Sequence, residues 1–240
     1  MTYKSTNASG VQKIAFRELM KGVYTCVPGH VTALIAGGAQ QRAQVRVGVV
    51  RVEINGAEVS MPPITDVPVL FPGDDYAVEY EITPGCEGMI YFSQRCVDGW
   101  KNTGGVAQNP LARFHDLQDA FFVPGFRSLP NVLPAFANNG IRLRNKSGSQ
   151  FVWLKNDNTI VADNGVGSVT VSPDGAVSVV NGAGNITLGA DGIVNINGVT
   201  IDTSGRITPP PGGGITGANG VGYETHRHNE TGTITGGPIA

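Results

Sequence analysis

The sequence predicts an all-β chain, with a small antiparallel barrel in its first part and an elongated, stacked β structure in its second. Two observations carry this prediction. In the first part, strand-like segments bounded by Gly and Pro turns follow one another closely. From residue 141 onward, apolar residues recur in pairs at positions i and i+2, separated by Gly-rich turns. Alternation with a period of two places both members of a pair on one face of a strand.

Composition excludes several classes of protein. The 240 residues carry a formal net charge of −2, so the composition shows no excess of basic residues of the kind that binds nucleic acid. No apolar run approaches the roughly 20 residues that span a bilayer, and the polar stretch Met1–Gly10 lacks the apolar core of a signal peptide. We therefore expect a protein made in a cytoplasm, without a transmembrane segment. Cys26, Cys86 and Cys96 show no CxxC spacing, which favours reduced thiols over disulfides or a zinc site.

The first part begins with a short amphipathic helix and continues as strands. Val11, Ile14 and Leu19 fall at helical spacing, which predicts a helix from about residue 10 to residue 21. Strands are expected over residues 24–34, 43–52, 58–61, 66–71, 76–82 and 88–93. Asn55-Gly56 suits a tight hairpin between the second and third of them. So many antiparallel strands in a short stretch suggest a Greek-key barrel, with the oligonucleotide-binding (OB) architecture as the candidate.

Residues 98–136 have no regular pattern but are rich in aromatic side chains. They include Trp100, Phe114, Phe121, Phe122 and Phe126. Such a density in a loop-like segment predicts that it packs either on the barrel or on a neighbouring chain.

The second part consists of a short strand-and-turn unit that is repeated. The apolar pairs are Ile141/Leu143, Val152/Leu154, Ile160/Ala162, Val169/Val171, Val177/Val179, Ile186/Leu188, Val194/Ile196 and Val199/Ile201. Their first members are 11, 8, 9, 8, 9, 8 and 5 residues apart. A regular spacing of this kind is typical of an elongated β structure rather than a compact domain.

A meander of such strands from one chain is too thin to bury its apolar face. Identical copies around a shared axis would cover that face and close the sheet edges, so we expect an intertwined three-chain β-prism, or β-helix. Each buried apolar side chain would contribute on the order of 1.5–3 kcal/mol before entropy is subtracted. The expected fold is therefore an OB-like barrel followed by a trimeric β-rod.

The end of the chain has the chemistry of a metal-bound apex. The run from Pro209 to Gly214 cannot continue a regular strand, and His226-Arg227-His228 follows it. In an extended strand His226 and His228 share one face, so three chains around an axis would present six imidazoles, a set that suits an octahedral divalent transition ion. An isolated HxH is more often a pair of surface histidines, and its place at the end of a Gly-rich rod is what favours the metal site.

These observations divide the chain into four segments. They are 1–22, an N-terminal helical segment; 23–136, an OB-fold domain with an aromatic-rich loop extension; 137–208, a triple-stranded β-helix; and 209–240, a metal-binding tip.

Two stretches of the chain resemble the central membrane-piercing spike proteins of contractile-tailed bacteriophages, of the short type without a lysozyme domain. One comprises residues 62–69 (PPITDVPV) and 115–125 (HDLQDAFFVPG), which look like the OB domain of these spikes. The other is residues 196–202 (INGVTID), which resembles their rod repeats. The alternation of eight- and nine-residue repeats departs from the strict eight-residue repeat of some spikes.

The resemblance implies a homotrimer whose barrel end attaches to the hub or baseplate of a phage tail and whose rod points at the host outer membrane. It also implies iron (Fe²⁺), one ion per three chains, held by His226 and His228; affinity alone would not select iron over copper or zinc. The function it implies is mechanical puncture of the outer membrane during tail contraction by a virion protein. Neither enzymatic activity nor a nucleic-acid or small-molecule partner is expected.

Four other functions compete with this one. A receptor-binding fibre would be expected to end in a broad binding domain. A related contractile particle, a bacteriocin or a type VI secretion-like system, would use the same kind of tip. An OB barrel in a nucleic-acid-binding protein would need a basic groove with stacking aromatics, which the sequence lacks. An enzyme would need His115-Asp116 with Asp119, or Ser93 or Cys96 as nucleophile, but none of these lies in a recognisable catalytic motif. A structural hydrogen-bonding role is expected for His115 and Asp116.

Overall fold

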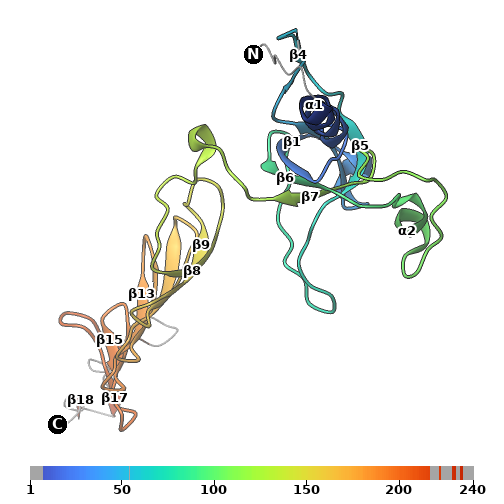
Figure 1. Cartoon of the computed structure of the whole chain (residues 1–240). Coiled ribbons are helices and arrows are strands. Elements are labelled where there is room, and N and C mark those ends of the chain that lie inside the picture. Colours follow the sequence, from blue (N-terminus) through green and yellow to red (C-terminus); the bar gives the residue numbers. More distant parts are fainter. Residues whose placement is uncertain (1–7, 54, 217–221, 223–228, 231–232, 235–240) are drawn as a thin grey trace. The chain divides into compact units, whose positions relative to one another are not determined.

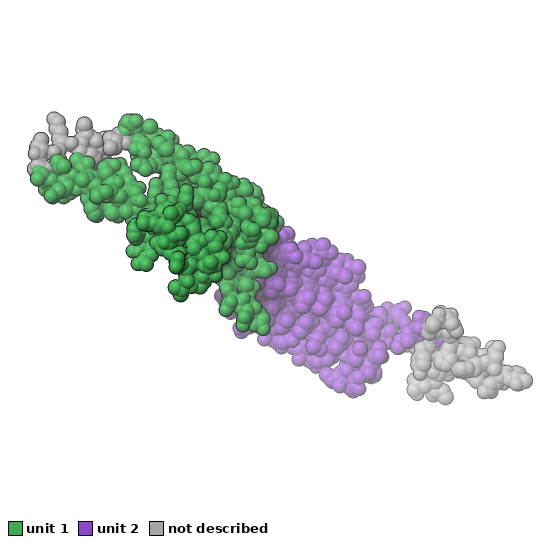
Figure 2. Space-filling model, turned by 90° about the vertical axis from the view of Figure 1, so that its right-hand side faces the viewer, with its two compact units in different colours: residues 1–132 green, residues 133–240 purple. Residues whose placement is uncertain are grey.

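The computed structural model describes residues 8–53, 55–216, 222, 229–230 and 233–234. The chain forms two compact units, Met1–Val132 and Leu133–Ala240 (Figure 2). Strands make up most of the regular structure of both units (Figure 1), which confirms the predicted all-β class. Within the described ranges, no helix is long and apolar enough to cross a membrane.

The first unit opens with the predicted helix, α1 (Ala8–Met20). None of its residues is buried, and Val11, Phe16 and Leu19 are 61%, 64% and 73% exposed. The helix therefore adds nothing to the core of its own unit.

Five strands of the first unit form a curled sheet. They are β1 (Cys26–Leu34), β2 (Arg42–Val47), β5 (Ile64–Pro68), β6 (Glu87–Phe92) and β7 (Ala120–Pro124), in the order β5-β2-β1-β6-β7. All neighbouring strands are antiparallel. A parallel bridge between Val69 and Phe122 joins the two outer strands, and the Leu70 N–H donates to the Phe122 carbonyl at 2.9 Å. This closure produces the strand pairing of an OB-type barrel.

The barrel encloses the hydrophobic core of the chain. The buried cluster consists of Val31, Ala43, Val45, Ile64, Val67, Val69, Ile82, Ile90, Phe92, Ala120 and Phe122. Two glycines allow the strands to approach closely: a β-carbon on Gly29 would lie 2.5 Å from Ile90 Cδ1, and one on Gly88 would lie 2.3 Å from the Val123 carbonyl oxygen.

Two of the predicted barrel strands differ from the structure. The strand expected over 43–52 ends at Val47, and its last residues form β3 (Arg51–Val52), which pairs with β4 (Glu58–Val59) in the predicted Asn55-Gly56 hairpin. The strand expected over 76–82 is absent, apart from an isolated bridge between Gly73 and Ala77. This segment turns back on residues 72–73 instead, with the Val78 N–H donating to the Pro72 carbonyl at 2.8 Å, and Tyr76 is 94% exposed in this loop. The loop protrudes from the barrel (Figure 1).

The segment 98–136 is more regular than its sequence suggests. It contains α2 (Asp98–Thr103), β7 and the 3₁₀ turn η2 (Leu129–Asn131). Strand β7 lacks an alternating pattern because both of its faces are covered: Phe122 lies in the core, and the Phe121 ring packs on Trp100 with ring centroids 5.6 Å apart. The aromatic segment thus supplies the fifth strand of the barrel.

The second unit is a nine-stranded antiparallel meander. Its strands are β8 (Gly140–Arg144), β9 (Phe151–Lys155), β10 (Ile160–Asp163), β11 (Gly167–Val171), β12 (Val177–Asn181), β13 (Asn185–Leu188), β14 (Val194–Ile196), β15 (Val199–Ile201) and β16 (Ile207–Thr208). They pair in sequence order, and each of the eight predicted apolar pairs lies within one strand. Every ladder of this sheet therefore joins strands of a single chain. A separate hairpin of β17 (Asn229–Glu230) and β18 (Thr233–Ile234) lies beyond it in sequence.

A buried ion pair holds the long segment before β7 to the barrel. Asp119 is fully buried and accepts hydrogen bonds from Arg113 Nη2 at 2.8 Å, Arg113 Nε at 3.1 Å and the Val97 N–H at 3.0 Å. Burial by itself raises the pKa of Asp119, but the bonds from Arg113 and Val97 and the charge of Arg113 outweigh it, so the pKa lies below its ordinary value. The hydrogen bonds to Asp119 in turn raise the pKa of Arg113.

We predict that Arg113→Ala destabilises the barrel by about 3–5 kcal/mol, because it leaves the buried Asp119 carboxylate without its counter-charge. The matched control is Lys21→Ala, which breaks the exposed Glu18–Lys21 pair and should cost less than about 1 kcal/mol. Urea unfolding followed by Trp100 fluorescence in a Trp153→Phe background reports on the barrel alone, since each unit holds one tryptophan. Equal costs for the two variants would contradict a structural role for the pair.

The same pair predicts how stability depends on pH. Since the pKa of Asp119 is lower in the folded than in the unfolded chain, its contribution is complete above the ordinary carboxyl pKa of 3.8 and is lost as the pH falls through the folded value. Asp119→Asn should therefore flatten the acid limb of a stability–pH curve measured from pH 7 downward. An unchanged acid limb would show that other carboxylates control it.

Candidate assembly face and metal site

The apolar pairs of the second unit lie directly opposite one another across the sheet and form two continuous rows on one face. One row is Ile141, Leu154, Ile160, Val171, Val177, Leu188, Val194, Ile201 and Ile207. The other is Leu143, Val152, Ala162, Val169, Val179, Ile186, Ile196 and Val199. We call this surface the apolar face. Opposed side chains on one face of an antiparallel sheet are close enough to pack along the whole row.

The apolar face is not covered by its own chain. Ile141, Leu143 and Leu154 are 68%, 64% and 50% exposed, whereas Val31 and Phe122 of the barrel core are fully buried. Among residues 133–216 none reaches the buried class. The second unit therefore has a regular hydrogen-bonded sheet but no hydrophobic core.

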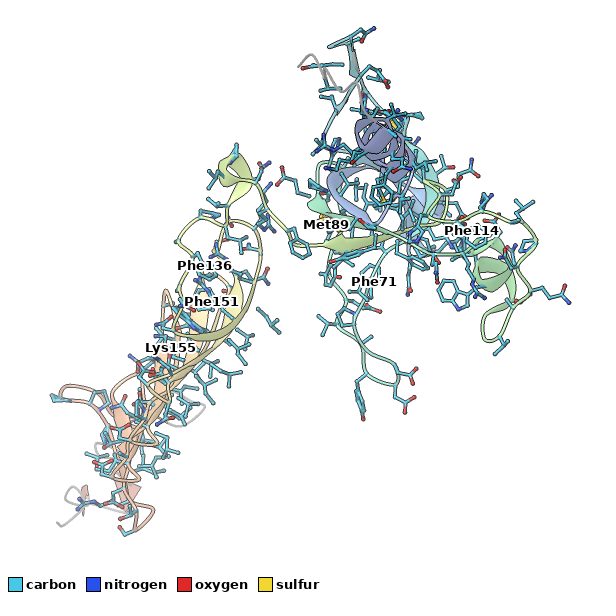
Figure 3. All side chains as sticks on the ribbon, viewed as in Figure 1. Phe71, Met89, Phe114, Phe136, Phe151 and Lys155 are labelled. Carbon is cyan, nitrogen blue, oxygen red and sulfur yellow. The ribbon has the colours of Figure 1, made fainter. Side chains whose placement is uncertain are left out.

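The opposite face of the sheet is polar along most of its length. Its central row is Arg142, Trp153, Val161, Thr170, Ser178, Thr187, Asn195, Thr200 and Thr208. At its start the Arg142 guanidinium lies over the rings of Phe151 and Trp153, 4.1 and 4.6 Å from their centroids, and Lys155 also lies over Trp153. Figure 3 labels Phe151 and Lys155 at this end of the sheet. A sheet with one apolar and one polar face is built to pack on one side only.

An open hollow of about 680 Å³ lies along part of the apolar face. Five members of the second apolar row line it, namely Leu143, Val152, Ala162, Val169 and Val179. A surface of this kind suits the side chains of another protein surface rather than a polar small molecule.

The predicted metal ligands, His226 and His228, lie outside the described residues. On either side of them in sequence, Thr216 bridges Gly222, and Asn229–Glu230 pairs with Thr233–Ile234. The donor set itself, two imidazoles per chain, fits a transition ion only if several chains contribute.

One other cluster in the described part of the chain has the composition of a metal site. Ligand atoms of Cys96, Asp98 and Asp119 lie within 4.8 Å of one another. The Arg113 Nη2 atom lies 3.1 Å from Cys96 Sγ and 2.8 Å from a carboxylate oxygen of each aspartate. A guanidinium thus already supplies the positive charge at this position, and the cluster is a structural ion pair rather than a metal centre.

The residues considered for catalysis are engaged in separate local hydrogen bonds. His115 Nδ1 lies 2.9 Å from the Tyr24 carbonyl oxygen, and the Tyr24 N–H donates to the His115 carbonyl at 3.3 Å. Asp116 Oδ1 accepts from the Gln118 N–H at 2.9 Å, and Ser93 Oγ accepts from the Arg95 N–H. These bonds agree with the structural role predicted for His115 and Asp116.

The two barrel stretches singled out in the sequence meet in the fold, which the sequence pattern did not predict. Residues 62–69 contain β5 and residues 115–125 contain β7, the two strands that close the barrel. Together with α2 they also line a polar hollow of about 410 Å³ that includes Asp66, Lys101 and Asp116. The barrel part of the predicted resemblance thus lies in the residues that close the barrel.

A comparison with known proteins points to the same part of the chain, the barrel. Residues 27–125 match the family model described as phage protein Gp138 N-terminal domain. The matched stretch begins at the second residue of β1 and ends one residue after β7, so it contains all of the five-stranded barrel except Cys26. A search of curated proteins found no match to the chain. Over its barrel, the chain is therefore similar to a phage protein.

Proposed function

We propose that this chain is the central spike of a contractile phage tail, a virion protein that punctures the host outer membrane mechanically when the tail contracts. In this role the barrel attaches to the tail hub or baseplate and the sheet of the second unit forms the shaft. The observation that carries the proposal is a phage-type barrel followed, in the same chain, by a sheet with an apolar face on which no residue is buried.

Three copies around one axis are the arrangement that best suits this sheet. With the apolar faces turned inward, three nine-stranded sheets form a triangular prism, and the polar row from Arg142 to Thr208 faces water. The apolar side chains that one chain leaves exposed then form the core of the shaft. The stability of the shaft is then approximately a sum of contacts between neighbouring layers, since each layer is held by the layers above and below it.

A metal at the tip compensates for the loss of core where the shaft narrows. Three chains supply six imidazoles from His226 and His228, and the proposed ion is Fe²⁺, one per three chains. The bound ion would join the three chains by coordination at a point where few side chains remain to pack. The proposal involves no catalysis, no nucleic acid and no small-molecule substrate.

A tip protein of a related contractile particle, such as a bacteriocin or a type VI secretion-like system, is the second candidate. The same sheet and HxH pair would serve it, and the similarity of residues 27–125 to a phage protein favours the tail of a phage.

The apolar face gives the first test. We predict that Val179→Asp prevents assembly or lowers stability by about 3 kcal/mol or more per chain, because it buries an uncompensated charge between the sheets. Native mass spectrometry and heating in detergent should show three chains that resist dissociation in the unmodified protein and not in the variant.

The matched control for that test is Ser178→Asp, one residue away on the polar face, which should change stability by no more than about 0.5 kcal/mol. A folded monomer in dilute solution, or equal effects of the two substitutions, would refute the proposed packing.

The tip gives the second test. His226→Ala combined with His228→Ala should leave the trimer and its sheets intact but remove the metal, which elemental analysis should find at one ion per three chains in the unmodified protein. Acid should release the ion as well, because imidazole binds metals in its neutral form. His30→Ala in β1 serves as the control and should retain the ion. Stoichiometric metal in the double variant would rule out these ligands.

A further inference from the structure

The two edges of the nine-stranded sheet are chemically different. Because the strands run alternately in opposite directions, successive turns lie on opposite edges. Turns on one edge carry Asp157, Asp174 and Asp191, which are spaced 17 residues apart. Turns on the other edge carry Asn164 and Asn181, also 17 residues apart. We call these the Asp edge and the Asn edge. The true repeat of the rod is thus a two-strand hairpin, which explains the alternation of eight and nine residues.

The three turns of the Asp edge share one geometry. In each, the aspartate Oδ1 accepts a hydrogen bond from the backbone N–H two residues later, at 2.9 Å for Asp157, 3.1 Å for Asp174 and 3.0 Å for Asp191. The next residue has a positive φ, 68° at Asn158, 88° at Gly175 and 84° at Gly192. The turns therefore present equivalent aspartates at equivalent positions.

The turns of the Asn edge have a second, equally constant geometry. Asn164 Oδ1 accepts from the N–H groups of Val166 at 3.0 Å and Gly167 at 2.8 Å. Asn181 Oδ1 accepts from those of Ala183 at 2.9 Å and Gly184 at 2.8 Å. Both side-chain oxygens are used to cap the turn, which directs the amide nitrogens away from it.

The hydrogen-bonding atoms that are not used within the turns are complementary on the two edges. Among the described residues, the Nδ2 atoms of Asn164 and Asn181 donate to no acceptor, and the Oδ2 atoms of Asp174 and Asp191 accept from no donor. All four side chains are exposed. The Asn edge thus offers free amide donors at Asn164 and Asn181, and it also carries Asp163, whose Oδ1 accepts from the Gly165 N–H at 2.6 Å. The Asp edge offers free carboxylate acceptors, and an amide with a carboxylate is the stronger kind of hydrogen-bonding pair.

The turns of the two edges are also staggered by one strand. The Asp174 turn joins β11 to β12, whereas the Asn164 turn joins β10 to β11 and the Asn181 turn joins β12 to β13. At a strand spacing of about 4.8 Å, an Asp turn is level with the gap between two Asn turns. Edges of this kind can interdigitate when two copies stand side by side at the same height.

We propose that the corners of the assembled shaft are polar zippers, in which the Asp edge of one chain interlocks with the Asn edge of a second copy. This inference rests on the proposed trimer, because three sheets around one axis necessarily bring unlike edges together at each corner. In the resulting register, Asp174 lies between Asn164 and Asn181 of the neighbouring copy, and Asp191 lies next to that copy's Asn181. The apolar face supplies most of the binding energy, while the zipper restricts the relative heights of the chains to steps of one two-strand repeat.

Disulfide trapping tests this register. Asp174→Cys with Asn181→Cys, and separately Asp191→Cys with Asn181→Cys, should give covalent trimers on non-reducing gels after mild oxidation. A bond within one chain is excluded, since a five-residue strand separates the edges by about 16 Å and a disulfide needs Cα atoms about 4.4–6.8 Å apart. Cys26, the exposed native thiol, is changed to Ser in every sample.

The matched control is Asp157→Cys with Asp174→Cys, which places both thiols on the Asp edge, since the Asp edges of two chains should not meet. We expect about tenfold more covalent trimer from the Asp–Asn pairs than from this control, given the strict distance requirement of a disulfide. A trimer by native mass spectrometry that forms no bond from either Asp–Asn pair, or as much from the control, would overturn the zipper and leave the proposed function standing. A monomer would overturn both.

Discussion

The structure depends on one constraint, which is that the nine-stranded sheet has a hydrophobic face and no interior to place it in. The barrel buries its hydrophobic core within one chain, because its five strands close on themselves and bury Val31, Ile90 and Phe122 completely. The sheet cannot do this, because a single layer covers neither of its faces. Its backbone is nonetheless fully organised, with every ladder made within the chain. Folding of the strands and burial of their side chains are therefore separate problems in this protein.

That separation explains why sequence reasoning succeeded in the second unit. A strand whose two faces differ in polarity can be recognised from the alternation of apolar and polar residues in its sequence. All eight apolar pairs, from Ile141/Leu143 to Val199/Ile201, lie in strands. The barrel is harder to read, because its strands contact neighbours on both faces. Phe121 and Phe122 sit side by side on opposite faces of β7, so the strand that closes the barrel has no alternating pattern. The opposite case is the strand predicted over residues 76–82. Tyr76 and Val78 alternate with smaller or polar residues in the sequence, but they lie in an exposed loop outside the sheet.

The candidate site also has a part that could be predicted from the sequence and a part that could not. The apolar face could be predicted residue by residue, since it depends only on strand periodicity. The Arg113–Asp119 pair could not, because it depends on a long segment folding back onto β6 and β7, and charged residues six positions apart in a loop give no sequence signal. Nor could the contact between residues 62–69 and 115–125, which arises only when β5 and β7 close the barrel. His226 and His228 are predicted as metal ligands from their spacing, their place after the Gly-rich rod and the resemblance to spike proteins. They lie outside the described residues, so the metal site stays a prediction.

The difference between the two edges of the sheet bears on how such a shaft could reach a single register. Two apolar rows of Val, Ile and Leu are nearly uniform along their length, so packing alone would allow neighbouring sheets to slide by two strands at little cost. Hydrogen bonds between the edges do not remove this degeneracy within the regular repeats, because Asp157, Asp174 and Asp191 are equivalent. The ends of the shaft differ from its middle, however. At the last turn, Ser204 takes the position of these aspartates, and Asp202, two residues earlier, accepts from the N–H groups of both Ser204 at 2.9 Å and Arg206 at 3.0 Å. At the start, Asn145 donates its amide to Ser149 at 2.9 Å rather than leaving it free. A chain displaced by one hairpin would place a regular turn opposite one of these irregular ends, so the ends supply the register that the repeats cannot.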